Sequence, residues 1–595
     1  MKSSRVSLLG RAMRLVWQSA PAATVAKAAV LLIQGGLPIV SLYLTKLMID
    51  AVTAGALSPD PDFARALWFI VGLGGVAVAA AVCMSLATFL GEAQEHAVAD
   101  HVVALVLAKS VAVDLAHYED PTYYDTLHRA QQEASHRPMR VVDGLGQLGQ
   151  SGVALAALVG LLLSLHWVIA VVLVAAALPG TLLRLNYSQR LYEWQRRATP
   201  VERQSWYFHW LLTGEAYAKE IRLFDFGGVF VQRVNDLRRN LRRMRLRLTA
   251  RRAVGELIGE IASILAIFGA LAYIAQETLL GAITVGSLVM YYQAFQKGQT
   301  YLREVLGALA HLYEDTLFLG NLFEFLDVEP LIVAPRAARA LPRQMQGGIE
   351  INHVRLVYGG SERPVLDDIT MSIRPGEHIA LVGANGAGKT TLVKLLCRLY
   401  DPTAGNITLD GIDLRELDLA ALRREISVVF QDYARYDLTV RENIWLGNVL
   451  LEPNDHRIAA AAHAAGATAM IGKLPRGYET RLGKWFDDEQ ELSIGEWQKI
   501  ALARAFVRDA RIVVLDEPTS ALDPSAEYEV FRKFRELAAG RTTILISHRF
   551  STVRTADRIY VLTNGRITES GSHDELMGRG GEYARMFELQ AVNYR

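Results

Sequence analysis

The sequence has few cysteines and almost no net charge. Only Cys83 and Cys397 occur among 595 residues, and they lie in different halves of the chain, so the sequence predicts no disulfide framework. No set of cysteines and histidines stands at the spacing that a structural metal site requires. The formal net charge of +1 favours no polyanionic partner, and we expect no nucleic acid to bind.

Charged residues are also absent from long stretches of the first half of the chain. Residues 28–45, 66–91 and 144–183 contain no Asp, Glu, Lys or Arg. As a helix, the third stretch would measure about 60 Å, which is twice the thickness of a bilayer core. It therefore predicts two membrane spans joined by a tight turn near His166 and Trp167.

Two further apolar stretches complete the predicted membrane domain. Residues 261–276 and 278–296, separated by Glu277, raise the number of predicted spans to six. A soluble helical bundle is the alternative reading of these segments. Such a bundle needs polar faces toward water, and residues 66–91 offer none.

The arginines predict how these spans are oriented. Nine arginines lie between Arg233 and Arg252, on the connection between the fourth and fifth spans. The predicted outer loops contain a single Lys or Arg, and they are residues 48–65, 164–168 and 276–282. Because basic residues stay on the cytoplasmic side, we expect a multi-pass protein of the plasma membrane whose chain after the sixth span is cytoplasmic.

These features divide the chain into four parts. Residues 1–20 have no small-residue cleavage site after an apolar core, which predicts an interfacial elbow helix rather than a cleaved signal peptide. Residues 21–327 form the predicted all-α six-helix membrane domain, with long helical extensions into the cytoplasm. Residues 328–347, rich in Pro, Ala and Arg, predict a linker to a second domain at 348–595.

The second domain contains a glycine-rich run that predicts phosphate binding. Residues 383–390 (GANGAGKT) follow a strand-like segment, 378–382, and lead into a helical pattern at 391–400. This is the context of a nucleotide-binding P-loop, and it argues against a chance glycine-rich turn. The predicted nucleotide-binding residues are Gly383, Ala384, Asn385, Gly386, Ala387, Gly388, Lys389, Thr390 and Thr391. Lys389 should reach the β- and γ-phosphates of ATP, and Thr390 should ligate Mg²⁺.

Two carboxylates end the next predicted buried strand. Residues 511–516 (RIVVLD) finish with Asp516, and Glu517 follows directly. Asp516 fits a second Mg²⁺ ligand, and Glu517 fits the group that orients or deprotonates the attacking water. A solvated carboxylate in a turn is the alternative for Glu517, but a neighbouring P-loop makes it improbable. A further predicted strand at 542–547 ends directly before His548.

The order of these motifs resembles the α/β nucleotide-binding domain of the ATP-binding-cassette (ABC) family over about residues 348–590. The resemblance implies that Tyr358 stacks on adenine and that Gln431 contacts Mg²⁺ and the attacking water. It also implies that His548 contacts the γ-phosphate, and that Asp523 lies in a loop linking the two ATP sites of a dimer.

The same resemblance assigns a signature loop, but with altered residues. Ser493 and Gly495 match the family, in which this loop covers the ATP held by the opposite subunit. The family pattern is LSGGQ, whereas this chain has LSIGE, with Ile494 and Glu496 as the differences. A carboxylate near a phosphate should weaken binding unless it points away.

With six spans and one ATPase, the chain resembles a half-transporter of the type IV ABC exporter fold. The resemblance implies that two chains enclose two ATPs and alternate between inward and outward states. It also implies that irregular patches at 118–124 and 214–226 are coupling helices that dock on the ATPase near Gln431. A homodimer is favoured because Glu517, Gln431 and His548 are all present, and a heterodimer is the alternative because the signature is altered.

The sixth predicted span is unusually polar. Its polar residues are Tyr291, Tyr292, Gln293, Gln296 and Lys297. They predict a water-filled substrate cavity, unless the helix simply leaves the bilayer from Lys297 onward. Two sequence segments, residues 485–486 (WF) and 492–505 (LSIGEWQKIALARA), resemble segments of exporters of ribosomally made peptides such as lantibiotics. We therefore predict ATP-driven peptide export, with lipid or drug export and a nucleotide-gated channel as alternatives.

Overall fold

The computed structural model describes the whole chain apart from residues 1–4, 57–62, 135–136, 165–166, 334, 336, 343–344, 360, 518–531, 533–539, 548 and 593–595. Its contacts divide the chain into two units. The first comprises residues 1–113 and 121–329, and the second comprises residues 114–120 and 330–595. The short segment 114–120 therefore belongs to the second unit, although it interrupts the first in sequence.

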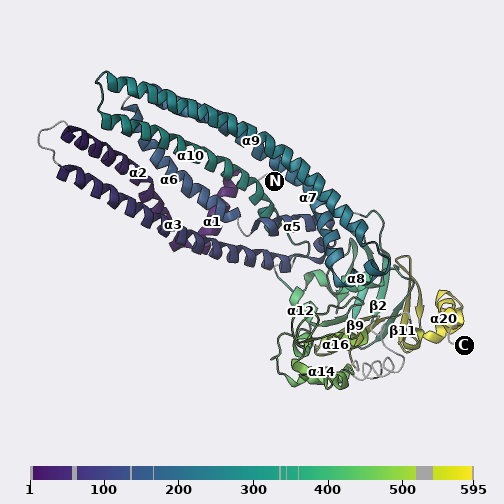
Figure 1. Cartoon of the computed structure of the whole chain (residues 1–595). Coiled ribbons are helices and arrows are strands. Elements are labelled where there is room, and N and C mark those ends of the chain that lie inside the picture. The colour runs from purple at the N-terminus through teal and green to yellow at the C-terminus, as the bar shows by residue number, and fades with distance from the viewer. Residues whose placement is uncertain are drawn as a thin grey trace. The chain divides into compact units, whose positions relative to one another are not determined.

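The first unit is helical (Figure 1). Its helices are α1 (Arg5–Ser19), α2 (Pro21–Ala56), α3 (Phe63–Ala112), α5 (Pro121–Ala134), α6 (Arg137–Leu163), α7 (Trp167–Thr213), α8 (Glu215–Leu223), α9 (Gly227–Leu279) and α10 (Val285–Leu326). The long helices pack in pairs, α2 with α3, α6 with α10 and α7 with α9. The stretches predicted as membrane spans lie in six long helices, α2, α3, α6, α7, α9 and α10. By length and composition, α2, α3, α6 and α9 are apolar enough to cross a membrane.

One predicted boundary between spans is wrong. Glu277 lies inside α9, which continues to Leu279, and the turn occupies residues 280–284. Gly281 there has a φ of 76°, and the Thr284 side chain caps α10 by accepting a hydrogen bond from the Ser287 N–H. A lone charge does not end a helix, whereas a left-handed glycine followed by an N-cap threonine does.

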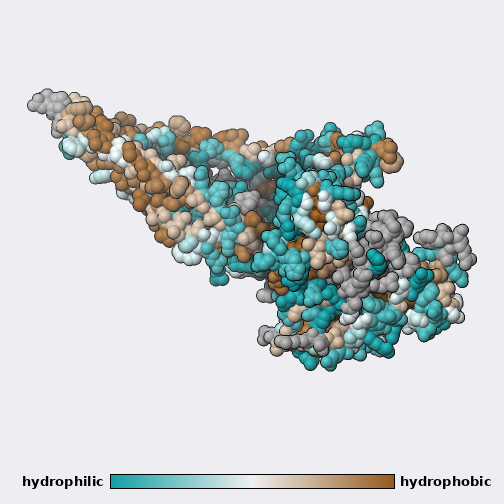
Figure 2. All heavy atoms as spheres, turned by 90° about the horizontal axis from the view of Figure 1, so that it is seen from below, coloured by the Kyte–Doolittle hydropathy of each residue, from teal (hydrophilic) through white to brown (hydrophobic). Residues whose placement is uncertain are grey.

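The helical unit combines an apolar core with a few buried polar contacts. Leu158, Leu162 and Phe295 belong to its core and are fully buried. The guanidinium of Arg137, at the start of α6, donates to the Asp315 carboxylate of α10 at 2.5 Å. The unit also carries most of the hydrophobic surface visible in Figure 2, which is the surface that lipid would cover.

The second unit is an α/β domain with two main sheets. The antiparallel sheet has the order β2 (Leu366–Ile373), β1 (Ile349–Leu356), β4 (Ala404–Leu409) and β5 (Ile412–Asp413). The other has the order β12 (Arg566–Gly571), β11 (Arg558–Thr563), β3 (His378–Val382), β10 (Thr542–Ile546), β9 (Ile512–Asp516) and β6 (Ile426–Val429). All its pairs are parallel except β11 with β12. This confirms the predicted P-loop ATPase class.

Short helices surround the sheets of this unit. They are α4 (Leu115–Tyr118), α11 (Lys389–Leu396), α12 (Leu419–Arg424), α13 (Val440–Trp445), α14 (His456–Ala464), α15 (Thr468–Ile471), α16 (Ile494–Phe506), α18 (Phe550–Val553), α19 (His573–Arg579) and α20 (Glu582–Val592). Small strands β7 (Arg481–Leu482) and β8 (Glu489–Gln490) pair with each other. The carboxyl ends of parallel strands share one edge, and ligands of such sheets bind there.

Candidate functional site

The loop after β3 is shaped for the close approach of a phosphate. Gly383, Gly386 and Gly388 have φ angles of 153°, 80° and 107°, a region that side chains rarely adopt. A Cβ on Gly383 would lie 2.1 Å from the Leu562 carbonyl oxygen, and one on Gly388 would lie 2.6 Å from Leu366. Only glycine fits these two positions. Helix α11 begins directly after the loop, so its free N–H groups face the same space.

Lys389 is held inside this loop by backbone oxygens. Its Nζ donates to the Gly383 carbonyl at 2.8 Å and to the Ala384 carbonyl at 3.0 Å, and the residue is 7% exposed. Burial lowers the pKa of Lys389, while the carboxylates of Glu517 and Asp516 act in the opposite direction. A phosphate at the mouth of the loop would supply the anionic partner that a buried ammonium favours.

Thr390 and Asp516 form a pair of oxygen donors beside Lys389. The Thr390 hydroxyl donates to Asp516 Oδ2 at 2.8 Å, and Asp516 is 1% exposed. Burial raises the pKa of Asp516, although the hydrogen bond from Thr390 acts the other way. Hydroxyl and carboxylate oxygens are the ligands that Mg²⁺ prefers. Within the described residues, no group of three or more His, Cys, Asp or Glu is placed to hold a metal ion.

Glu517 and Gln431 meet although 86 residues separate them. Gln431 Nε2 donates to Glu517 Oε2 at 3.1 Å. Strand β9 pairs in parallel with β6, so residues that follow the two strands come to the same edge. Glu517 has a φ of 50°, and its N–H donates to the Ile546 carbonyl oxygen at 2.9 Å. A non-glycine residue in this left-handed region costs roughly 1 kcal/mol or more, which is typical of functional sites.

These side chains surround one cavity of about 440 Å³. Its lining residues are Val365, Asn385, Gly386, Gly388, Lys389, Thr390, Thr391, Gln431, Asp516 and Glu517. The structure therefore brings together the predicted phosphate loop, both predicted Mg²⁺ ligands, the glutamine and the candidate catalytic carboxylate. The arrangement can hold a nucleotide triphosphate next to a carboxylate that orients water.

Tyr358 lies among aromatic and cationic groups beside the start of α11. Its hydroxyl donates to Thr391 Oγ1 at 3.2 Å, and its ring meets that of Tyr400 edge-on, with centroids 5.1 Å apart. Lys394 Nζ lies 5.7 Å from the centre of the Tyr358 ring. A ring fixed in this way can serve as the predicted stacking surface for a base.

The signature loop leads into helix α16, which begins at Ile494. Ser493 is its N-cap, and the Glu496 carboxylate accepts from the Ser493 N–H at 2.9 Å and from its hydroxyl at 2.8 Å. Glu496 thus points toward Ser493, while Ile494 is 58% exposed. The spacing of Ser493 and Glu496 is a capping box, and this sequence signal would have predicted the helix start.

The predicted substrate residues of α10 take different environments. The Tyr291 ring packs against the apolar core, with its hydroxyl 3.3 Å from that of Ser164. Gln296 is exposed and donates to the Tyr292 hydroxyl at 2.8 Å, whereas Gln293 and Lys297 are half-buried. Their role in a cavity stays a prediction. The predicted residues His548 and Asp523 lie outside the described residues.

Known proteins resemble the chain over most of its length. Residues 366–520 match the family described as ABC transporter. The chain is 28% identical over 562 residues to the subtilin transport ATP-binding protein SpaT of Bacillus subtilis, covering 94% of this chain and 90% of that protein. It is 32% identical over 488 residues to the nisin transport ATP-binding protein NisT of Lactococcus lactis subsp. lactis, with 80% and 79% covered.

Other similar proteins match less of the sequence or share the fold. An ATP-dependent lipid A-core flippase of Syntrophus aciditrophicus (strain SB) is 41% identical over 329 residues, which cover 52% of this chain and 53% of the flippase. Among solved structures, a bacterial Atm1-family ABC exporter with ATP bound superimposes with a TM-score of 0.85 at 24% identity. The match covers 96% of this chain and 98% of the exporter.

Proposed function

The chain belongs to the ABC transporter family and is an ATP-hydrolysing exporter embedded in a membrane, with its ATPase domain in the cytoplasm, and we propose that it carries a peptide outward across the plasma membrane. The observation that carries the catalytic part of this proposal is the cavity in which Lys389, Thr390, Asp516, Gln431 and Glu517 meet. The fold and the helices of the first unit supply the transport part.

The proposed hydrolysis uses each group of the cavity in turn. Lys389 binds the β- and γ-phosphates of ATP and balances the charge that develops on them. Thr390 and Asp516 would hold Mg²⁺, which neutralises phosphate charge. Glu517 accepts a proton from the attacking water or orients it, and Gln431, which donates to Glu517, positions that carboxylate. The buried, preorganised donors need little rearrangement as charge develops.

We further propose that two identical chains form the working transporter. Ser493 is the N-cap of α16 and Gly495 lies in its first turn. The Gly495 N–H, and the Ser493 hydroxyl once it is released from Glu496, would donate to the ATP held by Lys389 of the partner subunit. One chain would then be unable to complete a site. Glu517 and Gln431 are both present and hydrogen-bonded to each other, which favours two equivalent sites over a heterodimer with one inactive site.

The relatives favour a peptide as cargo. The subtilin and nisin transport proteins match over 90% and 79% of their own lengths. The lipid A-core flippase is more identical but matches over only 53% of its length. Because cargo is selected within the membrane unit, likeness across the whole chain argues more strongly about cargo than likeness over about half of it.

Transport by the purified chain in proteoliposomes tests the proposal. The candidate cargo is the precursor peptide encoded nearest to the gene for this chain, and a fluorescent lipid serves as the competing cargo. We expect ATP-dependent accumulation of the peptide, and none with Glu517→Gln. Movement of the lipid alone would favour flipping, and ion conductance that persists in Glu517→Gln would favour a channel.

A further inference from the structure

Residues 114–120 join helices α3 and α5 of the first unit but make their contacts within the second. They contain the single-turn helix α4 and an acidic residue on each side of it, Asp114 and Glu119. The two acidic residues make the contacts that hold this segment within the second unit.

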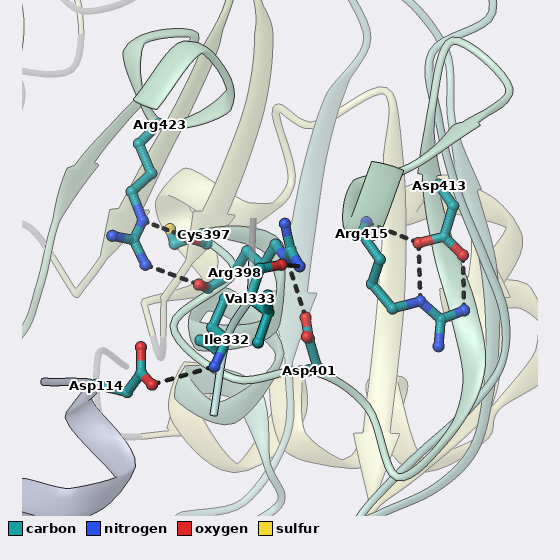
Figure 3. Close-up of polar contacts among 9 residues, drawn as sticks. All are labelled: Asp114, Ile332, Val333, Cys397, Arg398, Asp401, Asp413, Arg415 and Arg423. Carbon is teal, nitrogen blue, oxygen red and sulfur yellow. Dashed lines mark hydrogen bonds and ion pairs between the residues drawn. The ribbon is translucent and has the colours of Figure 1, made fainter. Parts of the chain in front are cut away.

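Asp114 connects residues 114–120 by hydrogen bonds to residues that follow α10 (Figure 3). Its Oδ2 accepts from the Leu331 N–H at 2.5 Å and from the Ile332 N–H at 3.1 Å. The adjacent Val333 carbonyl accepts from Arg398, a residue just after α11 that is 2% exposed. Asp114 is thus connected, through residues 331–333, to the end of the helix that begins at the phosphate loop.

Glu119 contacts α11 and the turn after it directly. Its Oε1 accepts from Lys394 Nζ at 2.6 Å, and its Oε2 accepts from the Tyr400 hydroxyl at 2.5 Å. Burial alone would raise the pKa of Glu119, but the hydrogen bonds from Lys394 and Tyr400 lower it overall. The carboxylate is therefore ionised at neutral pH, and both of its oxygens are engaged by charge-assisted hydrogen bonds.

Both partners of Glu119 touch Tyr358. The Tyr400 ring meets the Tyr358 ring edge-on at 5.1 Å, with an interplanar angle of 89°. Lys394 Nζ lies 5.7 Å from the centre of the Tyr358 ring and 5.8 Å from that of Tyr400. The Tyr358 hydroxyl donates a hydrogen bond to Thr391, which lines the nucleotide cavity. The energy of an edge-on ring pair depends on the orientation of both rings. A shift of the Tyr400 ring therefore changes the preferred position of the Tyr358 ring.

We propose that Glu119 is a positioning residue for the base of ATP: through Tyr400 and Lys394 it fixes the Tyr358 ring on which the base stacks. The proposal rests on the stacking role given to Tyr358 as part of the proposed function. ATP then binds more tightly while Glu119 keeps its contacts with Lys394 and Tyr400. By thermodynamic reciprocity, bound ATP holds the segment in place by the same factor.

The test compares Glu119→Ala and Tyr400→Phe with the wild-type chain, full length and in lipid nanodiscs. Tyr400→Phe keeps the ring pair but removes the hydroxyl that donates to Glu119. We expect either change to raise the ATP concentration for half-maximal hydrolysis about fivefold, at the low end of coupling between sites, with kcat changed less than twofold. The double variant should be no worse than the stronger single variant, because both remove one interaction.

Tripolyphosphate, which has no base, separates positioning of the base from general damage. Its inhibition constant as a competitor of ATP should be unchanged in both variants. Glu479→Ala is the matched control, because Glu479 pairs with Arg441 at 2.6 Å in the same unit and should leave ATP half-saturation unaltered. Equal weakening of ATP and tripolyphosphate, or no change for ATP, would overturn the role of Glu119.

Tyr358→Ala distinguishes failure of this inference from failure of its premise. If Tyr358→Ala raises the half-saturating ATP concentration and Glu119→Ala does not, the stacking role stands and the inference about Glu119 is wrong. If Tyr358→Ala does not change the half-saturating ATP concentration, the stacking role of Tyr358 is wrong, and the role proposed for Glu119 is then wrong as well.

Discussion

The carboxylate of Glu496 gives the most specific prediction about turnover. It stands where the family pattern has glutamine, and it accepts hydrogen bonds from the N–H and hydroxyl of Ser493. Glu496→Gln removes the charge but keeps a side-chain oxygen for the N–H, because glutamine also serves in capping boxes. The start of α16 should therefore be preserved. We expect the variant to reach half-maximal hydrolysis at a lower ATP concentration.

The size of the effect follows from the hydrogen-bond lengths around Ser493. The carboxylate lies 2.8 Å from the hydroxyl oxygen, and a phosphate that takes over this hydroxyl proton would lie on the order of 5 Å from the displaced carboxylate. Two unit charges at ~5 Å repel by about 3 kcal/mol at an effective dielectric constant of ~20. Ser493 is exposed, so solvent and salt reduce this to about 1 kcal/mol, or about fivefold in ATP concentration.

The assay is ATP hydrolysis by the reconstituted chain over a range of ATP concentrations. Glu575→Gln is the matched control, because Glu575 forms the corresponding capping box with Ser572 at the start of α19. The difference between wild type and Glu496→Gln should shrink as salt is added, since the repulsion is electrostatic. An unchanged half-saturation, or an equal shift in Glu575→Gln, would refute the argument.

Three further predictions test separate parts of the molecule. Glu517→Gln should abolish nearly all hydrolysis but leave ATP binding intact, because the Lys389 loop is untouched; a near wild-type rate would show that another group activates water. The chain expressed alone should purify as a dimer with Mg²⁺-dependent ATPase activity that Ser493→Arg abolishes, and an inert monomer would support a heterodimer instead. Asp315→Ala should lower the free energy of unfolding by about 3–5 kcal/mol, since it leaves the buried Arg137 without its 2.5 Å partner; an unchanged melting temperature in detergent would contradict this.

The nucleotide cavity was predictable because its residues follow recognisable local patterns. Each candidate lies just after a buried strand or at the start of a helix, and parallel strands place such positions at one edge of a sheet. The order of the motifs along the chain was therefore enough to bring Gln431 beside Glu517, although no local signal links them. The helices of the first unit were predictable for a similar reason, because long stretches without charge are conspicuous.

Boundaries and long-range polar contacts were not predictable in the same way. Glu277 interrupts the apolar stretch and so predicts a break, but a helix end depends on backbone conformation, which Gly281 and Thr284 determine. The contact between Glu119 and Tyr400 joins residues 281 positions apart in sequence. Tyr400 ends the predicted helical pattern at 391–400, but that pattern indicates nothing about contacts with distant residues. Glu119 is an exposed acidic residue in a turn, and no feature of the sequence identifies its partner.

Two carboxylates should shift the response of the transporter to ATP in opposite directions. Glu496 repels phosphate where the partner chain's site closes, so it weakens the ATP-bound dimer. By the role proposed for it, Glu119 positions the ring on which the base of ATP stacks, so it should strengthen ATP binding. Among the described residues they share no hydrogen-bond partner, so their effects on ATP half-saturation should add when both are changed.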